Sequence, residues 1–550
     1  MNEWFPKRTL GSLPAEAAAQ YGDREALCCN GRRCSFRQFS ADVDRAARAL
    51  LALGVQRGDK VSLWLPNRPE WLHLMFGILK VGAVLVPLNT RLRSADLQYV
   101  LKQSNTSTLI ATDRFGPSDA LSILQELFPD LGRAARGHES RLDWPAQGYP
   151  DLARLVLVGA PPVAGTSAWS GALAAGERIG ESALAERAAA VSPDDLALIL
   201  YTSGTTGFPK GVMHAHAMVR NMTDHASRMG VTRSDVILMY LPLFHVFGFT
   251  EGPLISMLTG ARQVLTETFS AEEALDLVAA ERVTLMHGFD THFKDLLEEQ
   301  ERRPRDVVSL RTGLCAAGMH NSTPIAVRTN RTLLRTMTAF GMSECSVGAC
   351  LSFLDSSAEQ RCETSGYPAP GYELRVVDPE TGSVQPPGVP GELLVRGYMV
   401  MQGYYRNPEE TARAVDAEGW LHTGDMALLR PDGYLRFMGR YKDMLKVGGE
   451  NVDPMEVEAF LLGHPAIQQV AIVAYPDARL NEVGVAFVLP RPGFKLAEAE
   501  VLAFCKGKIA SFKIPRRAVF VEELPMTSSG KIQKAKLRDW AKENLEPAPP

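Results

Sequence analysis

The residues with the clearest capacity for chemistry lie in one short loop, Tyr201–Gly211, which reads Tyr-Thr-Ser-Gly-Thr-Thr-Gly-Phe-Pro-Lys-Gly. The apolar run before it, 196–200, predicts a buried strand. Glycines after a strand allow backbone N–H groups to turn toward one anion, and hydroxyls and a lysine add donors. Gly211 stands where a Walker A loop has Ser or Thr, so this loop is of another kind. We expect it to bind the β- and γ-phosphates of a nucleotide through Thr202, Ser203, Gly204, Thr205, Thr206, Gly207 and Lys210.

Five further motifs follow this loop in chain order. They are Leu241–Gly248, Phe340–Glu344, Trp420–Asp425, Gly439–Val452 and Pro525–Ile532. Over about residues 20 to 540, the chain resembles the adenylate-forming superfamily of acyl-CoA synthetases, aryl-CoA ligases, firefly luciferase and the adenylation domains of peptide synthetases. It is most similar to the fatty acyl- and medium-chain acyl-CoA ligases. The resemblance implies that the protein uses ATP, Mg²⁺ and coenzyme A.

The resemblance assigns the adenosine to three of these motifs. Phe340 stands where the family usually has a tyrosine stacked on adenine, and Gly341 follows it. Asp425 and Arg440 match the residues that hold the ribose hydroxyls.

The same resemblance assigns three residues to the phosphates, to Mg²⁺ and to the adenylation step. Ser343 replaces a threonine that contacts phosphate and keeps its hydroxyl, and Glu344 matches the catalytic carboxylate that holds Mg²⁺, a cation that prefers oxygen ligands. Lys531 matches the lysine that reaches the substrate carboxylate and the α-phosphate. A carboxylic acid is already ionised at neutral pH, so the obstacle is the approach of one anion to another. Because a cation between the two lowers that barrier, we expect Lys531 to catalyse adenylation.

The thioester step needs a second surface. A thiol of pKa about 8.5 is partly ionised near neutral pH, so its position matters more than its deprotonation. In the family, the C-terminal domain swings about a hinge, which Lys442 matches, and removes the catalytic lysine. Lys446, which we expect to act in catalysis, and Gly448 and Gly449 match the loop that then lines the pantetheine tunnel, where a side chain in place of glycine would obstruct the thiol.

His245 follows Phe244, where the amino-acid-activating branch has an aspartate that binds the substrate ammonium. A histidine there resembles the CoA ligases, in which it adjoins the substrate carboxylate and the thiol entry. We therefore expect His245 to act in catalysis, and we expect no amino acid as substrate.

The acid itself is harder to predict. Two stretches depart from the family pattern: 288–291 replaces Gly-x-Pro-Thr, and 317–319 replaces Gly-Ala-Pro. Asp290 and His287 either bind a polar group on a larger acid or point away from it. The expected acid pocket contains Val246, Phe247, Phe289, Asp290, Ala317 and Gly318.

The elements that position these motifs contain an internal echo. Asp59–Pro66 and Asp235–Pro242 both run from Asp through an apolar stretch to Pro over the same spacing. Each predicts a buried strand, followed by a helical stretch, Gly-Ala and a second strand. Two such βαβ units predict two doubly wound parallel sheets side by side, although unrelated βαβ units can share this pattern.

The fold class is therefore α/β, with two domains. The N-terminal domain, 1–438, is expected to bind ATP and the acid through two doubly wound α/β subdomains. Short alternating runs in 362–438 predict a small antiparallel sheet or β-barrel. The hinge is placed at 439–442, and a smaller, mobile α+β domain at 443–550.

Composition excludes several classes of function. With 45% apolar and 22% charged residues the chain is that of a soluble globular protein, and its 550 residues exceed one core. A net charge of -4 gives no basic field for nucleic acid. We find no apolar segment of about 18 residues for a membrane span and no signal peptide. Eight scattered cysteines favour reduced thiols over a zinc site, and we expect a cytoplasmic protein.

We therefore expect an acid–thiol ligase, an AMP-forming acyl-CoA synthetase for a fatty, alicyclic or otherwise largely apolar acid. Its partners would be that small-molecule acid and CoA, and the sequence leaves a homodimer open. One alternative is an adenylation enzyme that loads a free-standing carrier protein; the sequence runs only from Lys531 to Pro550 after the last motif, too short a stretch for a fused carrier. The other is a non-catalytic adenylate-binding protein, which the retention of Lys531, Glu344 and Asp425 disfavours.

Overall fold

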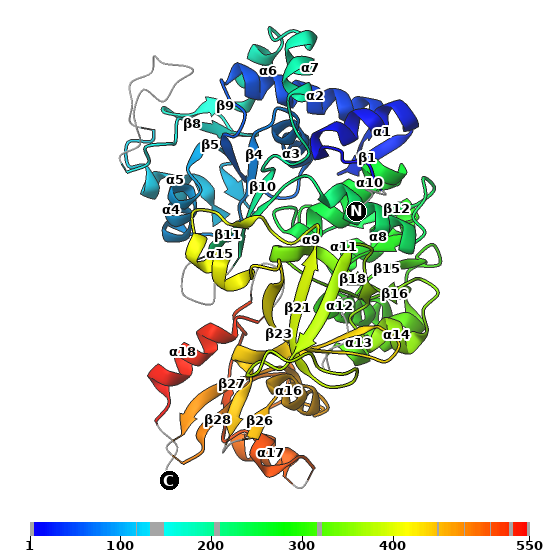
Figure 1. The fold of residues 1–550 in the computed structure, drawn as a ribbon, viewed down its shortest axis with the longest axis vertical. Helices are drawn as coiled ribbons and strands as arrows, with labels where there is room; N and C mark the ends of the chain where they lie inside the picture. Colours follow the sequence, from blue (N-terminus) through cyan, green and yellow to red (C-terminus); the bar gives the residue numbers. More distant parts are fainter. Residues whose placement is uncertain are drawn as a thin grey trace.

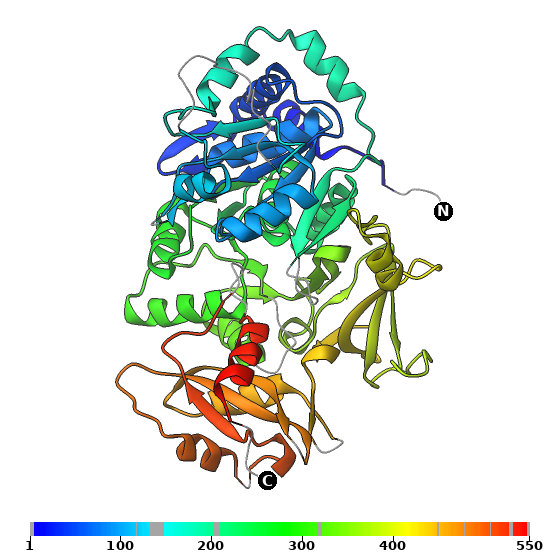
Figure 2. The ribbon, with the colours of Figure 1, turned by 90° about the vertical axis from the view of Figure 1, so that its left-hand side faces the viewer.

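The structure, a computed structural model, describes most of the chain, with the first α/β sheet toward one end of its long axis and the C-terminal region at the other end (Figure 1). Two α/β sheets form the N-terminal region, antiparallel strands follow, and a smaller α+β region ends the chain (Figures 1 and 2). Lys442, Glu450, Asn451 and Asn481 are described by their backbone alone. The described residues are 5–116, 118–132, 148–202, 209–315, 322–447, 450–477, 479–506, 508–526 and 532–546.

The first sheet has eight strands, and its centre is parallel. Apolar β-branched runs that are buried on both faces form this centre, as is usual for parallel sheets. In order across the sheet the strands are β22 (Gly403–Tyr404), β11 (Lys210–His214), β10 (Leu198–Thr202), β4 (Val84–Pro87), β3 (Lys60–Trp64), β5 (Thr106–Ala111), β8 (Arg154–Leu157) and β9 (Ser167–Ala168).

The second sheet has seven strands, which are parallel except for the edge strand β2. In order they are β16 (Arg335–Met337), β15 (Thr312–Leu314), β14 (Leu285–Met286), β12 (Val236–Met239), β13 (Arg262–Leu265), β1 (Glu25–Cys29) and β2 (Arg32–Ser35).

Helices pack on both sheets, and local signals set their starts. Ser35 forms a capping box with Gln38 at the start of α2, and a proline at the first position starts α3. The helices of this part are α1 (Leu13–Tyr21), α2 (Phe36–Ala52), α3 (Pro69–Lys80), α4 (Ser94–Gln103), α5 (Ala120–Leu127), α6 (Trp169–Gly176), α7 (Glu181–Ala189), α8 (Met218–Arg228), α11 (Ala271–Glu281), α12 (Asp290–Arg302) and α13 (Thr323–Thr332).

The internal echo of the sequence forms one βαβ unit in each sheet, which confirms the predicted pair of parallel sheets. The first unit is β3–α3–β4. In the second, β12 and β13 are joined by α9 (Val246–Phe249), the π-helical turn η2 (Thr250–Leu254) and α10 (Ile255–Thr259).

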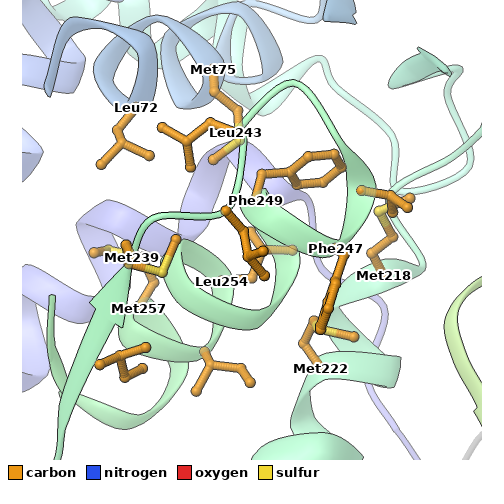
Figure 3. Packing of buried hydrophobic residues seen from close by; sticks show 14 of the residues in the cluster. Leu72, Met75, Met218, Met222, Met239, Leu243, Phe247, Phe249, Leu254 and Met257 are labelled. Carbon is orange, nitrogen blue, oxygen red and sulfur yellow. The ribbon is translucent and has the colours of Figure 1, made fainter. Parts of the chain in front are cut away.

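The two units share one hydrophobic core. The rings of Trp71 on α3 and Phe249 on α9 stack with centroids 6.4 Å apart. Figure 3 shows other side chains of this core, with Met75 on one side of Phe249 and Met222 of α8 beside Phe247 on the other. The second unit therefore lies between α3 and α8.

Residues 362–438 contribute mainly antiparallel strands, as predicted. Of the two predicted forms, the strand order is that of an open sheet, because β20 pairs along its length with β21 alone. Its strands are β20 (Tyr372–Val377), β21 (Gly391–Gly397), β23 (Leu421–Leu429) and β24 (Leu435–Arg440). A separate sheet contains β17 (Ala339–Met342), β18 (Ser346–Leu351) and β19 (Tyr367–Pro368), and the helices nearby are α14 (Ala358–Cys362) and α15 (Pro408–Ala414).

The C-terminal region is built on a five-stranded sheet with an apolar cluster on each face. Its helices are α16 (Pro454–Leu462) and α17 (Glu498–Cys505) on one face and α18 (Lys534–Asn544) on the other. Its strands are β25 (Leu445–Val447), β26 (Glu450–Val452), β27 (Ile467–Asp477), β28 (Asn481–Pro490) and β29 (Arg517–Phe520). Among the described residues of the whole chain, none of the helices combines the length and apolar character that crossing a bilayer requires.

Candidate active site

Lys210 stands at the second end of the predicted phosphate loop. β10 and β11 form a hairpin in which Thr202 lies opposite Lys210. The ammonium of Lys210 forms an ion pair with Glu410 of α15 and lies 5.0 Å from the centre of the Tyr404 ring. The hydrogen bond from Lys210 lowers the pKa of the Glu410 carboxyl. The predicted phosphate ligands that lie outside the described residues are Ser203, Gly204, Thr205, Thr206 and Gly207.

The turn that carries Ser343 and Glu344 is held from two sides. Burial lowers the pKa of His214 to about 4, so its ring is neutral, and Nε2 donates a hydrogen bond to the Ser343 carbonyl. The hydroxyl of Tyr404 donates to the Glu344 carboxylate at 3.0 Å. Burial and the charge of Glu344 raise the pKa of Tyr404, which keeps this hydroxyl protonated. Lys210 and Glu344 therefore meet at one tyrosine.

Phe340 and Gly341 lie on β17, in a tight hairpin with β18. Phe340 is buried, and its ring centre is 5.9 Å from that of Phe437 on β24. A Cβ on Gly341 would lie 2.6 Å from the carbonyl oxygen of Ser346, so the facing strand leaves room only for glycine. The hairpin explains Gly341 by packing, and the contact of Phe340 with adenine stays a prediction.

Asp425 and Arg440 face each other on neighbouring strands, β23 and β24. Arg440 Nε donates to Asp425 Oδ1 at 3.0 Å. Asp425 is buried, whereas 41% of the Arg440 side chain is exposed. The structure thus brings together the two residues predicted to hold the ribose.

His245 is the N-cap residue of α9, where a side-chain acceptor satisfies a free backbone N–H group. Its Nδ1 accepts a hydrogen bond from the N–H of Phe247 at 3.3 Å. The side chain is half-buried, and Val246 beside it is buried. The predicted catalytic histidine therefore has its orientation fixed by the helix that it begins.

Aromatic side chains gather around Phe247. Its ring centre lies 5.4 Å from that of Phe289 and 6.4 Å from that of His287. Asp290, the first residue of α12, accepts the N–H of the next residue at 2.9 Å. Ala317 and Gly318 lie outside the described residues, so the predicted acid pocket is described in part.

The residues predicted for the thioester step lie near the start of the C-terminal region. Lys446 is exposed on β25, and its N–H donates to Glu482 at 2.8 Å. The backbone of Lys442 lies in the short helix η4 (Tyr441–Asp443), directly after β24. Gly448, Gly449 and Lys531 lie outside the described residues.

The residues on either side of the Lys531 segment are firmly placed. Met526 and Ile532 form an antiparallel bridge. Gln533 donates to the Met526 carbonyl at 2.8 Å, and Lys534 pairs with the buried Glu458 at 2.6 Å. These contacts hold Met526 and Ile532, the described residues nearest to Lys531 in the chain.

The sequence reasoning missed Tyr404, Glu410 and His214. Asn407 and a following proline do signal a helix start with acidic residues in its first turn. Nothing local places that helix beside Lys210, because the contact depends on the pairing of β22 with β11, a strand far away in the chain, at Gly403 and Met213. Tertiary pairing thus completes the group around Lys210.

Comparisons with known proteins identify the family of the chain. The AMP-binding enzyme family matches residues 14–405, and the AMP-binding enzyme C-terminal domain matches residues 456–531. YngI of Bacillus subtilis is 36% identical over 96% of each chain. The mitochondrial medium-chain acyl-CoA ligase ACSF2 of Mus musculus is 34% identical over 98% of this chain and 88% of its own.

Two further relatives extend the comparison. In Rhodococcus jostii, the 3-[(3aS,4S,7aS)-7a-methyl-1,5-dioxo-octahydro-1H-inden-4-yl]propanoyl:CoA ligase is 35% identical over 97% of this chain and 99% of its own. The crystal structure of the anthranilate CoA ligase AuaEII with anthranoyl-AMP superposes with a TM-score of 0.84 at 28% identity over 98% of each chain. The chain belongs to the AMP-binding enzymes, and within them it is an AMP-forming ligase that uses ATP, Mg²⁺ and CoA to convert a carboxylic acid, through its adenylate, to a thioester.

Proposed function

We propose that the chain activates a largely apolar acid, aliphatic or alicyclic, and transfers its acyl group to CoA. The aromatic rings of Phe247 and Phe289 support an apolar substrate. The names of two relatives, a medium-chain acyl-CoA ligase and a ligase of a ring-bearing propanoate, point to the same class.

The observation that carries the proposed activation of the acid by ATP is the position of Tyr404. Its ring face contacts Lys210, and its hydroxyl contacts Glu344. We propose that Lys210 binds the β- and γ-phosphates with the loop that contains Thr202, and that Ser343 adds a hydroxyl. Glu344 offers the hard oxygen ligands that Mg²⁺ prefers, and Tyr404 orients that carboxylate. When bound, Mg²⁺ neutralises phosphate charge.

We assign the adenosine to the hairpin strands beside this group. Phe340 would stack on the adenine, with Gly341 next to it. Asp425 would accept hydrogen bonds from the ribose hydroxyls, and Arg440 holds that carboxylate in place.

We assign adenylation to Lys531, whose ammonium would lie between the substrate carboxylate and the α-phosphate. For the second step, rotation about Lys442 would exchange Lys531 for the surface of Lys446, Gly448 and Gly449. His245, at the start of the helix that carries Phe247, would adjoin the carboxylate and the entering thiol.

We also propose that the reaction with CoA occurs in the cytoplasm. All eight cysteines are free thiols, which suits a reducing compartment.

Pyrophosphate release across a panel of carboxylic acids, with and without CoA, tests the proposal, with products identified by mass spectrometry. We expect rapid turnover with CoA for a few apolar acids. Thioester formation with polar acids of the panel but with none of the apolar acids would contradict the proposed substrate class.

Two variants test the division of labour. Lys531→Ala should lose adenylation, yet retain part of thioester formation from supplied acyl-AMP. Gly449→Leu should do the reverse. Equal loss of both steps in Lys531→Ala, or normal thioester formation in Gly449→Leu, would contradict the assignments.

A further inference from the structure

A polar cluster lies beside the aromatic side chains that we assign to the acid. It consists of His225 from α8, Glu251 from the π-helical turn η2, and His287 at the end of β14, and each side chain is at most 2% exposed. Binding of an apolar acid does not require such groups, and burying them without full partners is unfavourable.

His225 and Glu251 form an ion pair in which the second carboxylate oxygen of Glu251 has no hydrogen-bond partner among the described residues. His225 Nδ1 lies 2.7 Å from Glu251 Oε1, and Nε2 lies 3.4 Å from the carbonyl oxygen of Gly348. Burial lowers the pKa of His225, but the charge and hydrogen bond of Glu251, the charge of Asp224 and the Gly348 carbonyl together outweigh burial and raise that pKa. Glu251 Oε2 is buried and has no hydrogen-bond partner among the described residues.

One ring N–H group of His287 has no hydrogen-bond acceptor among the described residues. Its Nδ1 accepts the N–H of Leu314 at 3.2 Å, and burial lowers its pKa to about 4, so the neutral ring carries its proton on Nε2. That Nε2–H group is buried and meets no acceptor among the described residues. The ring centre of His287 lies 6.4 Å from that of Phe247, which precedes Glu251 by four residues in the same helical segment. The charges of Glu251 and His225 also act on His287, in agreement with this placement.

The backbone around the cluster is adapted to it. A Cβ on Gly348 would lie 2.0 Å from His225 Nε2, and this glycine has a φ of +79°. Glu251 lies in a π-helical turn, a geometry that is frequent at functional sites. The cluster is thus built into three elements and does not result from one misplaced side chain.

We propose that Glu251 and His287 bind an oxygen substituent, hydroxyl or oxo, on the apolar body of the acid. This inference rests on the proposed function and narrows its substrate class. The Nε2–H of His287 donates to the substrate oxygen, and a hydroxyl there can also donate to Glu251 Oε2. Glu251 follows His245 by six residues in this helical segment, and we assign the carboxylate of the acid to His245, so the substrate oxygen lies several carbon atoms from that carboxylate.

Kinetics with matched acids test the proposal. The probes are cyclohexanepropanoic acid with its ring-oxo and ring-hydroxy derivatives, and decanoic acid with its hydroxy and oxo derivatives at successive carbons. For each pair we measure the ratio of kcat/KM, oxygen-bearing over parent, from CoA thioester formation. In the wild type, the best oxygen-bearing acid should exceed its parent about tenfold or more, because the parent leaves buried polar groups unpaired.

Three histidine variants separate the role of the donor. His287→Asn keeps an acceptor for the Leu314 N–H and removes the Nε2–H, so the ratio should fall to about one. His287→Gln places an amide donor near the position of Nε2 and should restore part of the ratio. His292→Asn is the matched control, because His292 Nδ1 also accepts a backbone N–H, at 3.1 Å from Phe289, and its ratio should equal that of the wild type.

A ratio near one throughout the wild-type series would overturn the inference and leave the ligase assignment intact. So would an unchanged ratio in His287→Asn, the result expected if the cluster holds a water molecule. If none of the acids yields a thioester, the proposed apolar substrate class fails, and this inference fails with it.

Discussion

The two βαβ units start from the same pattern and differ in the segment between their strands. In the first unit, the segment from Pro66 to Gly82 forms the regular helix α3. In the second, the segment from Pro242 to Gly260 is slightly longer, and the path passes through α9, the π-helical turn and α10. The longer segment thus carries the irregular turn.

The two units differ in role: the first contributes to the hydrophobic core, and the second contributes residues predicted to bind the acid. Nine residues after the proline the first unit has Met75, and the second has Glu251, which is equally buried but ion-paired. His245 and Phe247 also belong to the second unit. The regular copy fills the core, whereas the irregular copy positions the predicted acid-binding residues, and deviations from regular structure are expected at such sites.

The largest expected contrast comes from glycines within the two crossovers. A Cβ on Gly248 would lie 2.1 Å from the Pro242 carbonyl oxygen, whereas one on Gly77 would lie 3.1 Å from the Ala47 nitrogen. Gly248→Ala should lower the free energy of unfolding by about 4 kcal/mol and abolish activity, because backbone must move. Gly77→Ala should stay within about 1 kcal/mol, since better helix propensity offsets the tight contact. Urea denaturation measures both, and similar losses would contradict the contrast.

The second contrast is between Glu251 and Met75, each of which lies nine residues after the proline of its unit. Glu251→Gln should lower the free energy of unfolding by about 3 kcal/mol near pH 6, because it leaves protonated His225 without its counter-charge. The raised pKa of His225 makes the ion pair's contribution full below about pH 6.5, and the contribution disappears as pH rises through that raised pKa. The loss should therefore shrink at higher pH.

Met75→Ala serves as the control for this pair. It removes apolar contacts alone, so its loss of about 2–4 kcal/mol should not depend on pH. A loss in Glu251→Gln that is equally constant from pH 6 to 9 would show that the buried pair is not ionised.

Substitution of the aspartates that begin the two units should give a smaller difference in the free energy of unfolding. Asp235 is buried and accepts from Arg311 Nε at 2.7 Å, whereas Asp59 lies 3.9 Å from Arg154. Asp235→Asn should cost about 2 kcal/mol and Asp59→Asn less than about 1 kcal/mol. Although burial opposes it, Arg311 lowers the pKa of Asp235, so this stability is present above about pH 4 and is lost as pH falls through the lowered pKa. Thermal unfolding at pH 7 and at pH 3 gives both comparisons, and equal losses at the two pH values would refute the ion-pair explanation.

The smallest effect is predicted where the units are alike. Gly54 and Gly230 precede them with φ values of +79° and +58°. Alanine at either position should cost about 1 kcal/mol, mainly from the left-handed backbone, because Gly230 has open space around it. A much larger loss at one of the two would show that the units already differ before their first strands.

The sequence predicted the parts of the fold that depend on local patterns. The Asp-to-Pro echo correctly indicated two parallel sheets, and the alternating runs near Tyr372 and Gly391 indicated antiparallel strands. The pairing of Asp425 with Arg440 was also within reach, because both residues belong to recognisable motifs.

Other features could not be predicted in this way. The helical stretch expected after Pro242 is divided by a π-helical turn, and no sequence period distinguishes such a turn. The contacts of Tyr404 and of the cluster around Glu251 join elements that lie far apart in the chain. Their partners are set by tertiary packing rather than by spacing.

The ion pair between Lys210 and Glu410 has a consequence for nucleotide selection. On the proposed assignment, Lys210 already holds an anion before ATP arrives, so binding exchanges one negative group for another. Glu410 keeps Arg413 as a partner after the exchange. A ligand with a single negative charge gains little over the resident carboxylate, whereas a triphosphate adds charge that the carboxylate cannot match. On this assignment, the pair would favour a ligand with several negative charges over a ligand with one.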